Sequence, residues 1–189
     1  IGMQVQFDKH DLTVQQMVDE GTRRAYLNPD NPLRASIVSD PAGARINTKD
    51  NTPAVVHIDM VAGDKIEVMI AAKGGGSENK SKMVMLNPSD DIAEWVVKTL
   101  PTMGAGWCPP GMLGIGIGGT AEKAGVLAKE SLMDPVDIQE LIARGPETTE
   151  EKLRVDIYHK VNALGIGAQG LGGLTTVVDI KIKSMPTHA

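Results

Sequence analysis

Residues 106–119 read Gly-Trp-Cys-Pro-Pro-Gly-Met-Leu-Gly-Ile-Gly-Ile-Gly-Gly, and this stretch carries most of the information about the fold. The apolar run from Met112 to Ile117 predicts a short buried strand, because it is uncharged and bounded by glycine and proline. Thr120 follows directly and predicts the start of a helix that continues to about Met133. Seven glycines lie between Gly104 and Gly119. Such crowding indicates backbone that needs a positive φ angle or approaches another group closely.

The rest of the chain alternates between helical and strand patterns. Further helices are predicted over residues 11–27 with Asp11 as N-cap, 87–100 with Asn87 as N-cap, 134–145, and 148–164 behind a Thr148-x-x-Glu151 capping box. Strands are predicted over residues 54–61 and 65–71, joined as a hairpin, over the half-exposed run 176–183, and over residues 1–7. No repeat or linker divides the chain. We therefore expect one α+β domain over residues 1–189, with a mixed or antiparallel sheet flanked by helices.

Charge and cysteine usage exclude several classes of function. The chain has 24 acidic and 19 basic residues, a formal net charge of −5, and no basic patch. Five aromatic residues are too few for base stacking, so we expect no nucleic-acid partner. The single cysteine, Cys108, excludes an internal disulfide and a zinc site built from this chain's thiols alone. It also fits a reducing compartment.

Membrane insertion is not expected. Residues 99–121 and 161–178 are uncharged, but their glycines and prolines would make poor membrane-spanning helices. No basic segment followed by an apolar run opens the chain, so we expect no signal peptide and a cytoplasmic protein. The chain begins inside a strand pattern and ends on Met185-Pro186-Thr187-His188-Ala189. Both ends therefore look cut.

Two glycine patterns match the dinucleotide-binding motif G-x-G-x-x-G, at residues 114–119 and 165–170. The motif needs a strand before it and a helix after it. Cys108-Pro109-Pro110 precedes the first match and a predicted helix precedes the second, so nucleotide binding is disfavoured. It is kept only as a distant alternative.

Individual side chains allow more than one interpretation. The histidines at positions 10, 57, 159 and 188 are scattered and have no metal-ligand spacing. Arg34 could be a surface charge, but its planar guanidinium is also suited to binding a carboxylate. Cys108 could be a small buried residue. Its Gly/Pro-rich loop could instead present the sulfur as an iron–sulfur ligand, with backbone N–H groups nearby.

Three long motifs occur in order along the chain. They are Ala-Lys-Gly-Gly-Gly-Ser-Glu-Asn-Lys at 72–80, Gly-Trp-Cys-Pro-Pro at 106–110 running into Gly-Ile-Gly-Gly-Thr at 116–120, and Asn-Ala-Leu-Gly-Ile-Gly-Ala-Gln-Gly-Leu-Gly-Gly at 162–173. Together they closely resemble the α domain or α subunit of the iron–sulfur class I fumarases and their relatives, the tartrate dehydratases. The resemblance covers essentially the whole chain.

The resemblance implies a set of site residues. In that family three cysteines hold a [4Fe–4S] cluster, whose remaining iron binds the substrate. Cys108 matches the middle cysteine, and the other two would lie outside this chain. Gly76 matches a backbone contact to substrate, Arg34 a carboxylate-binding arginine, and His188 a catalytic histidine of proton transfer. Lys73 and Asn79 belong to the first motif without an assigned contact.

The resemblance also implies a reaction and partners. The reaction is the reversible hydration of fumarate to L-malate, a step of the tricarboxylic acid cycle. Partners are the dicarboxylic acid substrate, a β domain or β subunit that supplies the base, and further copies in a homo-oligomer. L-tartrate dehydratase and a non-catalytic assembly module remain alternatives. Because one thiolate cannot hold a cubane cluster, we expect this chain alone to bind no stable cluster and to be inactive.

Overall fold

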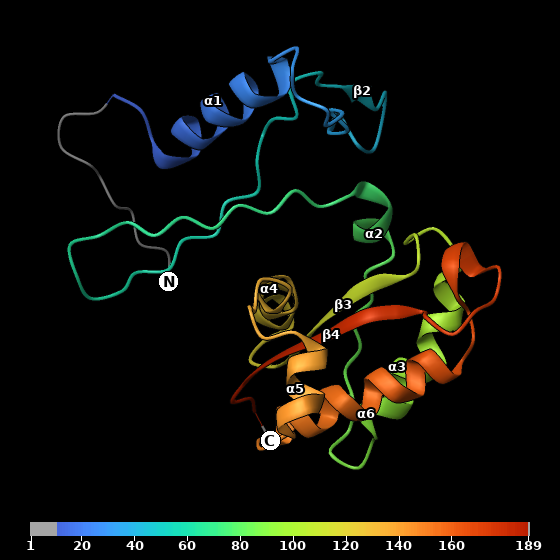
Figure 1. Ribbon diagram of the computed structural model, residues 1–189. Coiled ribbons are helices and arrows are strands. Elements are labelled where there is room, and N and C mark those ends of the chain that lie inside the picture. Colours follow the sequence, from blue (N-terminus) through green and yellow to red (C-terminus); the bar gives the residue numbers. More distant parts are fainter. Residues whose placement is uncertain (1–10, 189) are drawn as a thin grey trace. The chain divides into compact units, whose positions relative to one another are not determined.

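The computed structural model describes residues 11–188, and their contacts divide the chain into two compact units, Ile1–Val68 and Met69–Ala189. Figure 1 traces both units along the chain. The strand expected over residues 1–7 and the histidine at position 10 lie outside the described residues. No helix of the described part is both long and apolar enough to cross a membrane.

The first unit contains helix α1 (Val14–Leu27) and a short antiparallel pair, β1 (Val38–Ser39) with β2 (Ile46–Asn47). The helix was expected, but its N-cap is Thr13 and not Asp11. Thr13 and Gln16 form a capping box, in which the Thr13 hydroxyl accepts from the Gln16 N–H and Gln16 Oε1 accepts from the Thr13 N–H at 2.8 Å. The box satisfies two backbone donors that would otherwise stay unpaired.

The hairpin predicted over residues 54–61 and 65–71 is wrong. Neither run forms a strand, although both are rich in β-branched residues. Their apolar side chains are exposed within the described part of the chain, for example Val61 at 79% and Ile66 at 84%. A two-stranded hairpin is marginal in water unless a third strand or a helix covers it. The two runs therefore have the strand pattern, but no other element covers their apolar side chains within the described part of the chain.

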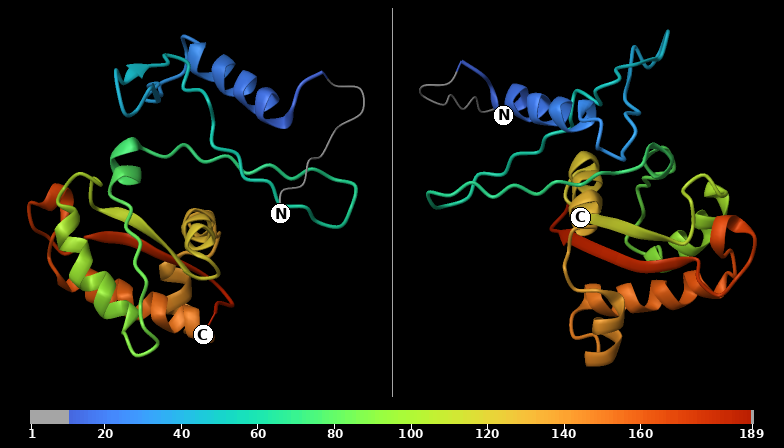
Figure 2. Two further views of the ribbon diagram at one scale, coloured as in Figure 1. Left: turned by 180° about the vertical axis from the view of Figure 1, so that it is seen from behind. Right: turned by 45° about the horizontal axis from the view of Figure 1, so that its top comes forward.

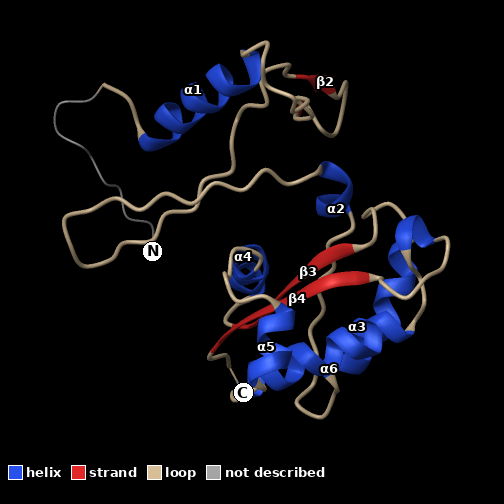
Figure 3. Ribbon diagram, in the orientation of Figure 1, coloured by secondary structure: helices blue, strands red, loops and turns tan. Residues whose placement is uncertain are grey.

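The second unit is built on a parallel strand pair, β3 (Gly111–Gly118) with β4 (Val177–Met185) (Figure 3). The pairing runs from Gly111↔Val177 to Gly118↔Met185, with a shift of one residue between Gly111 and Met112. Helix α4 (Ala121–Ser131) lies on one side of the pair, and α3 (Ile92–Thr99) with α6 (Thr149–Ala163) on the other (Figure 2). A parallel pair needs cover on both faces. The core between β4 and α6 includes the fully buried Ile157, Val161 and Ile180.

Two glycines of β3 are explained by this packing. A Cβ on Gly114 would lie 2.1 Å from the Ala128 carbonyl oxygen, and one on Gly116 would lie 1.9 Å from the Ala124 carbonyl oxygen. Helix α4 thus rests directly on the backbone of the strand. The alternation of glycine and isoleucine in this segment serves close packing between helix and strand.

The remaining elements mostly confirm the sequence analysis. The α+β class is confirmed, with the strands in two separate pairs, one antiparallel and one parallel. Thr120 precedes α4 and the Thr148 capping box opens α6, as expected. Two helices begin later than predicted, with Asp91 in place of Asn87 capping α3 and Asp137 in place of Asp134 capping α5 (Ile138–Arg144). Short elements not predicted are α2 (Gly75–Asn79) and the 3-10 turns η1 (Leu100–Met103) and η2 (Ala168–Gly170).

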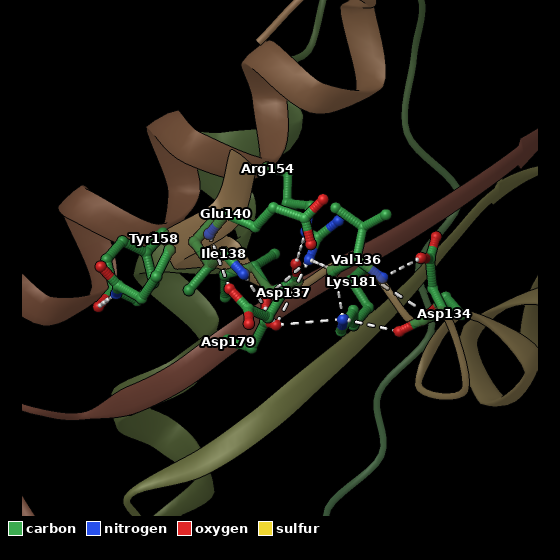
Figure 4. A network of polar contacts seen from close by, with 12 residues as sticks. Asp134, Val136, Asp137, Ile138, Glu140, Arg154, Tyr158, Asp179 and Lys181 are labelled. Atoms are coloured by element: carbon green, nitrogen blue, oxygen red, sulfur yellow. Dashed lines mark hydrogen bonds and ion pairs between the residues drawn. The ribbon is translucent and has the colours of Figure 1, made fainter. Parts of the chain in front are cut away.

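Strand β4 is more buried than its alternation predicted, because two of its charged residues lie in the interior (Figure 4). Asp179 pairs with Arg154 of α6 at 3.1 Å and with Lys181 at 3.2 Å, and all three are at most 5% exposed. The Lys181 ammonium also donates to the Asp134 and Val136 carbonyls at 2.8 and 2.6 Å. The backbone that leads into α5 therefore satisfies the extra positive charge.

This network predicts a large stability effect. Asp179→Asn keeps the side-chain volume but leaves Arg154 and Lys181 buried without a carboxylate, so the free energy of unfolding should fall by roughly 3–5 kcal/mol. Urea denaturation of the chain followed by circular dichroism measures it. The matched control is Asp156→Asn, which removes an exposed ion pair with Lys160 and should leave the midpoint unchanged. Equal midpoints for Asp179→Asn and the unmodified chain would contradict a stabilising role.

Candidate functional site

The loop before β3 presents Cys108 to solvent. Cys108 has a φ angle of +61°, a conformation uncommon for residues other than glycine, and its N–H donates to the Ala105 carbonyl at 2.9 Å. The neighbouring Trp107 is buried and its ring lies against Gly111, where a Cβ would be 2.6 Å from Cζ3. The loop is thus anchored by the indole on its inner side, which leaves the Cys108 thiol exposed on its outer side.

The third motif, residues 162–173, contacts the loop of Cys108. The N–H of Gln169, in the turn η2, donates to the Pro109 carbonyl at 2.7 Å. Asn162 at the end of α6 holds the other end of the motif, because its side-chain carbonyl accepts from the N–H groups of Thr176 and Val177 at 2.7 and 3.0 Å. Residues 162–173 therefore connect α6, β4 and the Cys108 loop.

The first glycine motif reaches the same loop. A Cβ on Gly76 would lie 2.6 Å from the Gly106 carbonyl oxygen, and a Cβ on Gly106 would lie 2.6 Å from Cε of Lys80. A Cβ on Gly75, the preceding residue, would meet no atom within 4 Å. Glycine at position 76 is thus required by its contact with the backbone of Gly106, two residues before Cys108. This contact brings two of the predicted site residues into one place.

A single thiol is the metal-ligating group that this place offers. Among residues 11–188, no three His, Cys, Asp or Glu side chains are grouped so that they could hold a metal ion. Cys108 fits one corner of an iron–sulfur cluster, because it is exposed and sits on ordered, non-helical backbone. The described residues do not fit a complete cluster site.

His188 lies at the other end of the strand pair. It follows β4 by three residues, whereas Cys108 precedes β3 by three, and the two strands run parallel. Seven residue steps along β3 span about 23 Å, so the described residues do not bring the imidazole to the thiol. His188 instead borders an open pocket of about 410 Å³ with Lys123 and Thr187, whose hydroxyl donates to the Gly119 carbonyl at 2.9 Å.

Arg34 belongs to the first unit. It is exposed in the segment between α1 and β1, after the proline-bounded loop that the sequence predicted. Asn51 shapes this segment, because its side-chain carbonyl accepts from the N–H groups of Ser36 and Ile37 at 2.9 and 3.2 Å.

Sequence reasoning missed Glu78. It lies in the first motif and forms ion pairs with Lys73 at 3.0 Å and with Lys129 of α4 at 2.9 Å. Hydrogen bonds from the two ammonium groups lower the pKa of the Glu78 carboxyl below its usual value, and the one from Lys129 has the larger effect. Membership in the motif was the only sequence signal for Glu78. Its partner Lys129 lies about 50 residues away in the sequence, so the pairing becomes visible only in the folded chain.

Comparisons with known proteins find one matching family model and several similar curated proteins. The model of a family described as fumarate hydratase (Fumerase) matches residues 1–189. The putative L(+)-tartrate dehydratase subunit alpha of Methanocaldococcus jannaschii is 35% identical over 177 residues, which are 90% of this chain and 60% of that protein. The L(+)-tartrate dehydratase subunit alpha of Escherichia coli K12 is 28% identical over 180 residues, 93% of this chain and 56% of that protein. The chain thus spans 56–60% of the length of these relatives.

The contact between Gly76 and Gly106 predicts a sharp difference between neighbouring substitutions. Gly76→Ala forces a methyl group against a backbone carbonyl and should lower the free energy of unfolding by about 1–3 kcal/mol. Gly75→Ala, in the same helix, meets open space and should not lower it, because alanine is the better helix former. Denaturant unfolding of the two variants measures the difference. Equal stability of both variants would show that α2 does not depend on this contact.

Proposed function

The chain belongs to the fumarate hydratase (Fumerase) family, and from that premise we propose that it is the α part of an iron–sulfur hydro-lyase that reversibly hydrates fumarate to L-malate. The observation that carries the proposal is the meeting of Gly76 with the loop of Cys108. Two motifs separated by about 30 residues converge on one exposed thiol, and the third motif braces the same loop. Such convergence is expected of a site and not of unrelated turns.

Cys108 is the residue of this chain that would hold the cluster, together with cysteines supplied from outside these 189 residues. When bound, the cluster supplies a Lewis acid that polarises the hydroxyl group gained or lost by the substrate. Gly76 would offer its backbone N–H to the substrate. Arg34 would bind a substrate carboxylate through two parallel hydrogen bonds.

His188 is proposed to transfer a proton. Hydration adds a hydroxyl group to one alkene carbon and a proton to the next, so one group must accept the proton that water loses. A neutral imidazole accepts a proton at one ring nitrogen and returns it in the reverse reaction. This assignment is supported by the resemblance at the Met185-Pro-Thr-His188 segment. The group that donates the proton to carbon during hydration, and removes it as a base in the reverse reaction, is proposed to come from the β part.

The relatives favour a second candidate. The proteins compared above are named as α subunits of L(+)-tartrate dehydratase, so the α part of a tartrate dehydratase is the alternative function. Both reactions remove or add water on a four-carbon dicarboxylate, and Arg34 and Gly76 would contact groups that the two substrates share. We further propose a β domain or β subunit as partner, a homo-oligomeric assembly and a cytoplasmic location. A non-catalytic assembly role would leave the chain folded and able to bind its β partner without cluster or turnover.

Turnover separates these candidates. The α part and its β partner, produced together and reconstituted with iron and sulfide under anaerobic conditions, should turn over fumarate with a kcat/KM well above that for L-tartrate. The reverse order would assign the tartrate reaction, and no turnover of either substrate by a cluster-loaded assembly would reject the hydro-lyase proposal.

Cys108→Ser tests the cluster ligand. The assembled enzyme with this variant should lose its visible iron–sulfur absorbance and all turnover, because serine does not supply a thiolate. Its circular dichroism spectrum should be unchanged, since the Cys108 side chain is exposed and not packed in the core. The 189-residue chain alone should retain no cluster after the same reconstitution. Full cluster occupancy in the serine variant would remove Cys108 from the ligand set.

His188→Asn tests the proton-transfer role. In the assembled enzyme it should reduce kcat by about 100- to 10,000-fold without loss of the cluster absorbance. The control is His159→Asn on the exposed side of α6, which should keep the activity of the unmodified enzyme. A His188 variant with unchanged kcat would mean that the imidazole stays at its own end of the strand pair during the reaction.

A further inference from the structure

Helix α2, which carries Gly76, cannot be stable by itself. It comprises only Gly75–Asn79, no side chain caps its N-terminus, and none of its residues is buried. One isolated helical turn costs more conformational entropy than its hydrogen bonds return. Tertiary contacts must therefore hold Gly76 in place.

The Glu78 carboxylate supplies two of these contacts from one side of the helix. Its two oxygens bind two different ammonium groups, Oε2 that of Lys73 and Oε1 that of Lys129. Lys73 precedes the glycine triplet and also donates to the hydroxyl of Ser77 at 3.3 Å, which in turn donates to the Gly74 carbonyl at 2.8 Å. These contacts connect both ends of the Gly74–Gly76 turn, because Lys73 precedes it and Ser77 and Glu78 follow it.

The packing of α4 holds the backbone at Lys129 in place. Lys129 lies in the last turn of α4, next to Ala128, whose carbonyl presses on Gly114 of β3. Strand β3 begins three residues after Cys108. The ion pair between Glu78 and Lys129 therefore ties α2 to the same rigid body that carries the thiol.

The opposite side of α2 contacts the Cys108 loop directly. Gly76 meets the Gly106 carbonyl, and the stem of Lys80 lies over Gly106. The helix is thus held between α4 and the loop, with Glu78 as its link to α4. If this link is removed, α2 loses its ion pair to α4, and the contacts that remain are those with Gly106 and the local hydrogen bonds of Lys73 and Ser77.

We propose that Glu78 is a positioning residue, which, through its ion pairs with Lys129 and Lys73, holds the Gly74–Gly76 turn against the Cys108 loop and so sets the place of the Gly76 backbone in the site. The inference rests on the proposed function only for its catalytic consequence. We call the two ion pairs of Glu78, with Lys129 and with Lys73, the clamp. The clamp is a property of the chain and can be measured without cluster or substrate.

The first experiment measures the clamp in the 189-residue chain. Glu78→Gln and Lys129→Met should each accelerate amide hydrogen exchange at residues 78–81, where the N–H groups of Glu78, Lys80 and Ser81 donate to backbone carbonyls of this turn. The expected acceleration is about three- to tenfold, as for the loss of one or two exposed ion pairs. Lys129→Arg keeps the charge and should restore slow exchange. The double variant should exchange no faster than Glu78→Gln alone, because the two residues act as a unit.

The control removes a comparable ion pair elsewhere. Asp156→Asn breaks the exposed pair between Asp156 and Lys160 in α6. These two side chains are about as exposed as those of Glu78 and Lys129, and the variant should leave exchange at residues 78–81 unchanged. Unaltered exchange at these residues in both Glu78→Gln and Lys129→Met, or equal acceleration by Asp156→Asn, would overturn the proposal.

The second experiment measures the consequence in the cluster-loaded assembly with its β partner. Glu78→Gln should raise KM about three- to tenfold and leave kcat within about twofold, because a misplaced backbone contact weakens substrate and transition state alike. The cluster absorbance should be unchanged. Loosened exchange with an unchanged KM would overturn the positioning role, while the unmodified enzyme's turnover would still support the proposed function. If the unmodified assembly turns over no dicarboxylate, the proposed function fails, and the exchange data still decide whether Glu78 is the clamp.

Discussion

The contact on which the second unit depends is the direct packing of α4 on the backbone of β3. Carbonyl oxygens of Ala124 and Ala128 occupy the positions where side chains of Gly116 and Gly114 would be. The contact fixes the height of α4 above the strand pair, and it fixes Lys129 with it. Any side chain at either glycine would separate helix from strand, since a backbone carbonyl cannot move aside as a flexible side chain can. The loop of Cys108 and the clamp on α2 both start from this rigid body.

Elements that depend on local chemistry could be predicted from the sequence. The capping box at Thr148, the helix start after Thr120 and the apolar strand over residues 112–117 all depend on neighbours within a few residues. The hairpin over residues 54–71 failed, because its pattern is local but its stability requires a covering surface. The same difference explains β4. Its alternating charged residues are typical of a strand with one solvated face. Asp179 and Lys181 are buried only because α5 and α6 pack beside them in the folded chain.

The candidate site also depends on contacts between residues that are far apart in the sequence. Motif resemblance identified Gly76 and Cys108, and the structure adds the reason why they belong together, a backbone contact that no spacing rule contains. Glu78 could not be singled out, because its partner Lys129 is brought near by the packing of α4. The place of His188 could not be inferred either. It follows from the parallel register of β3 and β4, which puts the ends of two distant segments at opposite ends of one strand pair.

That register has a consequence for how a site can be assembled on this fold. The β3–β4 pair is stiff, because α4 covers one face and the buried Arg154, Asp179 and Lys181 network joins β4 to α5 and α6 on the other. Cys108 and His188 therefore cannot approach each other by bending the strands. The segments attached to the strand ends are the parts that can change their direction, and His188 belongs to such a segment, which is tied to Gly119 by the Thr187 hydroxyl. The Gly119 N–H also donates to the Pro186 carbonyl at 3.2 Å, and each such hydrogen bond contributes about 1 kcal/mol, so the direction of this segment rests on few contacts. The loop of Cys108 is thus set by the chain's own packing, whereas the place of the proposed catalytic residue His188 depends on the short segment that follows β4.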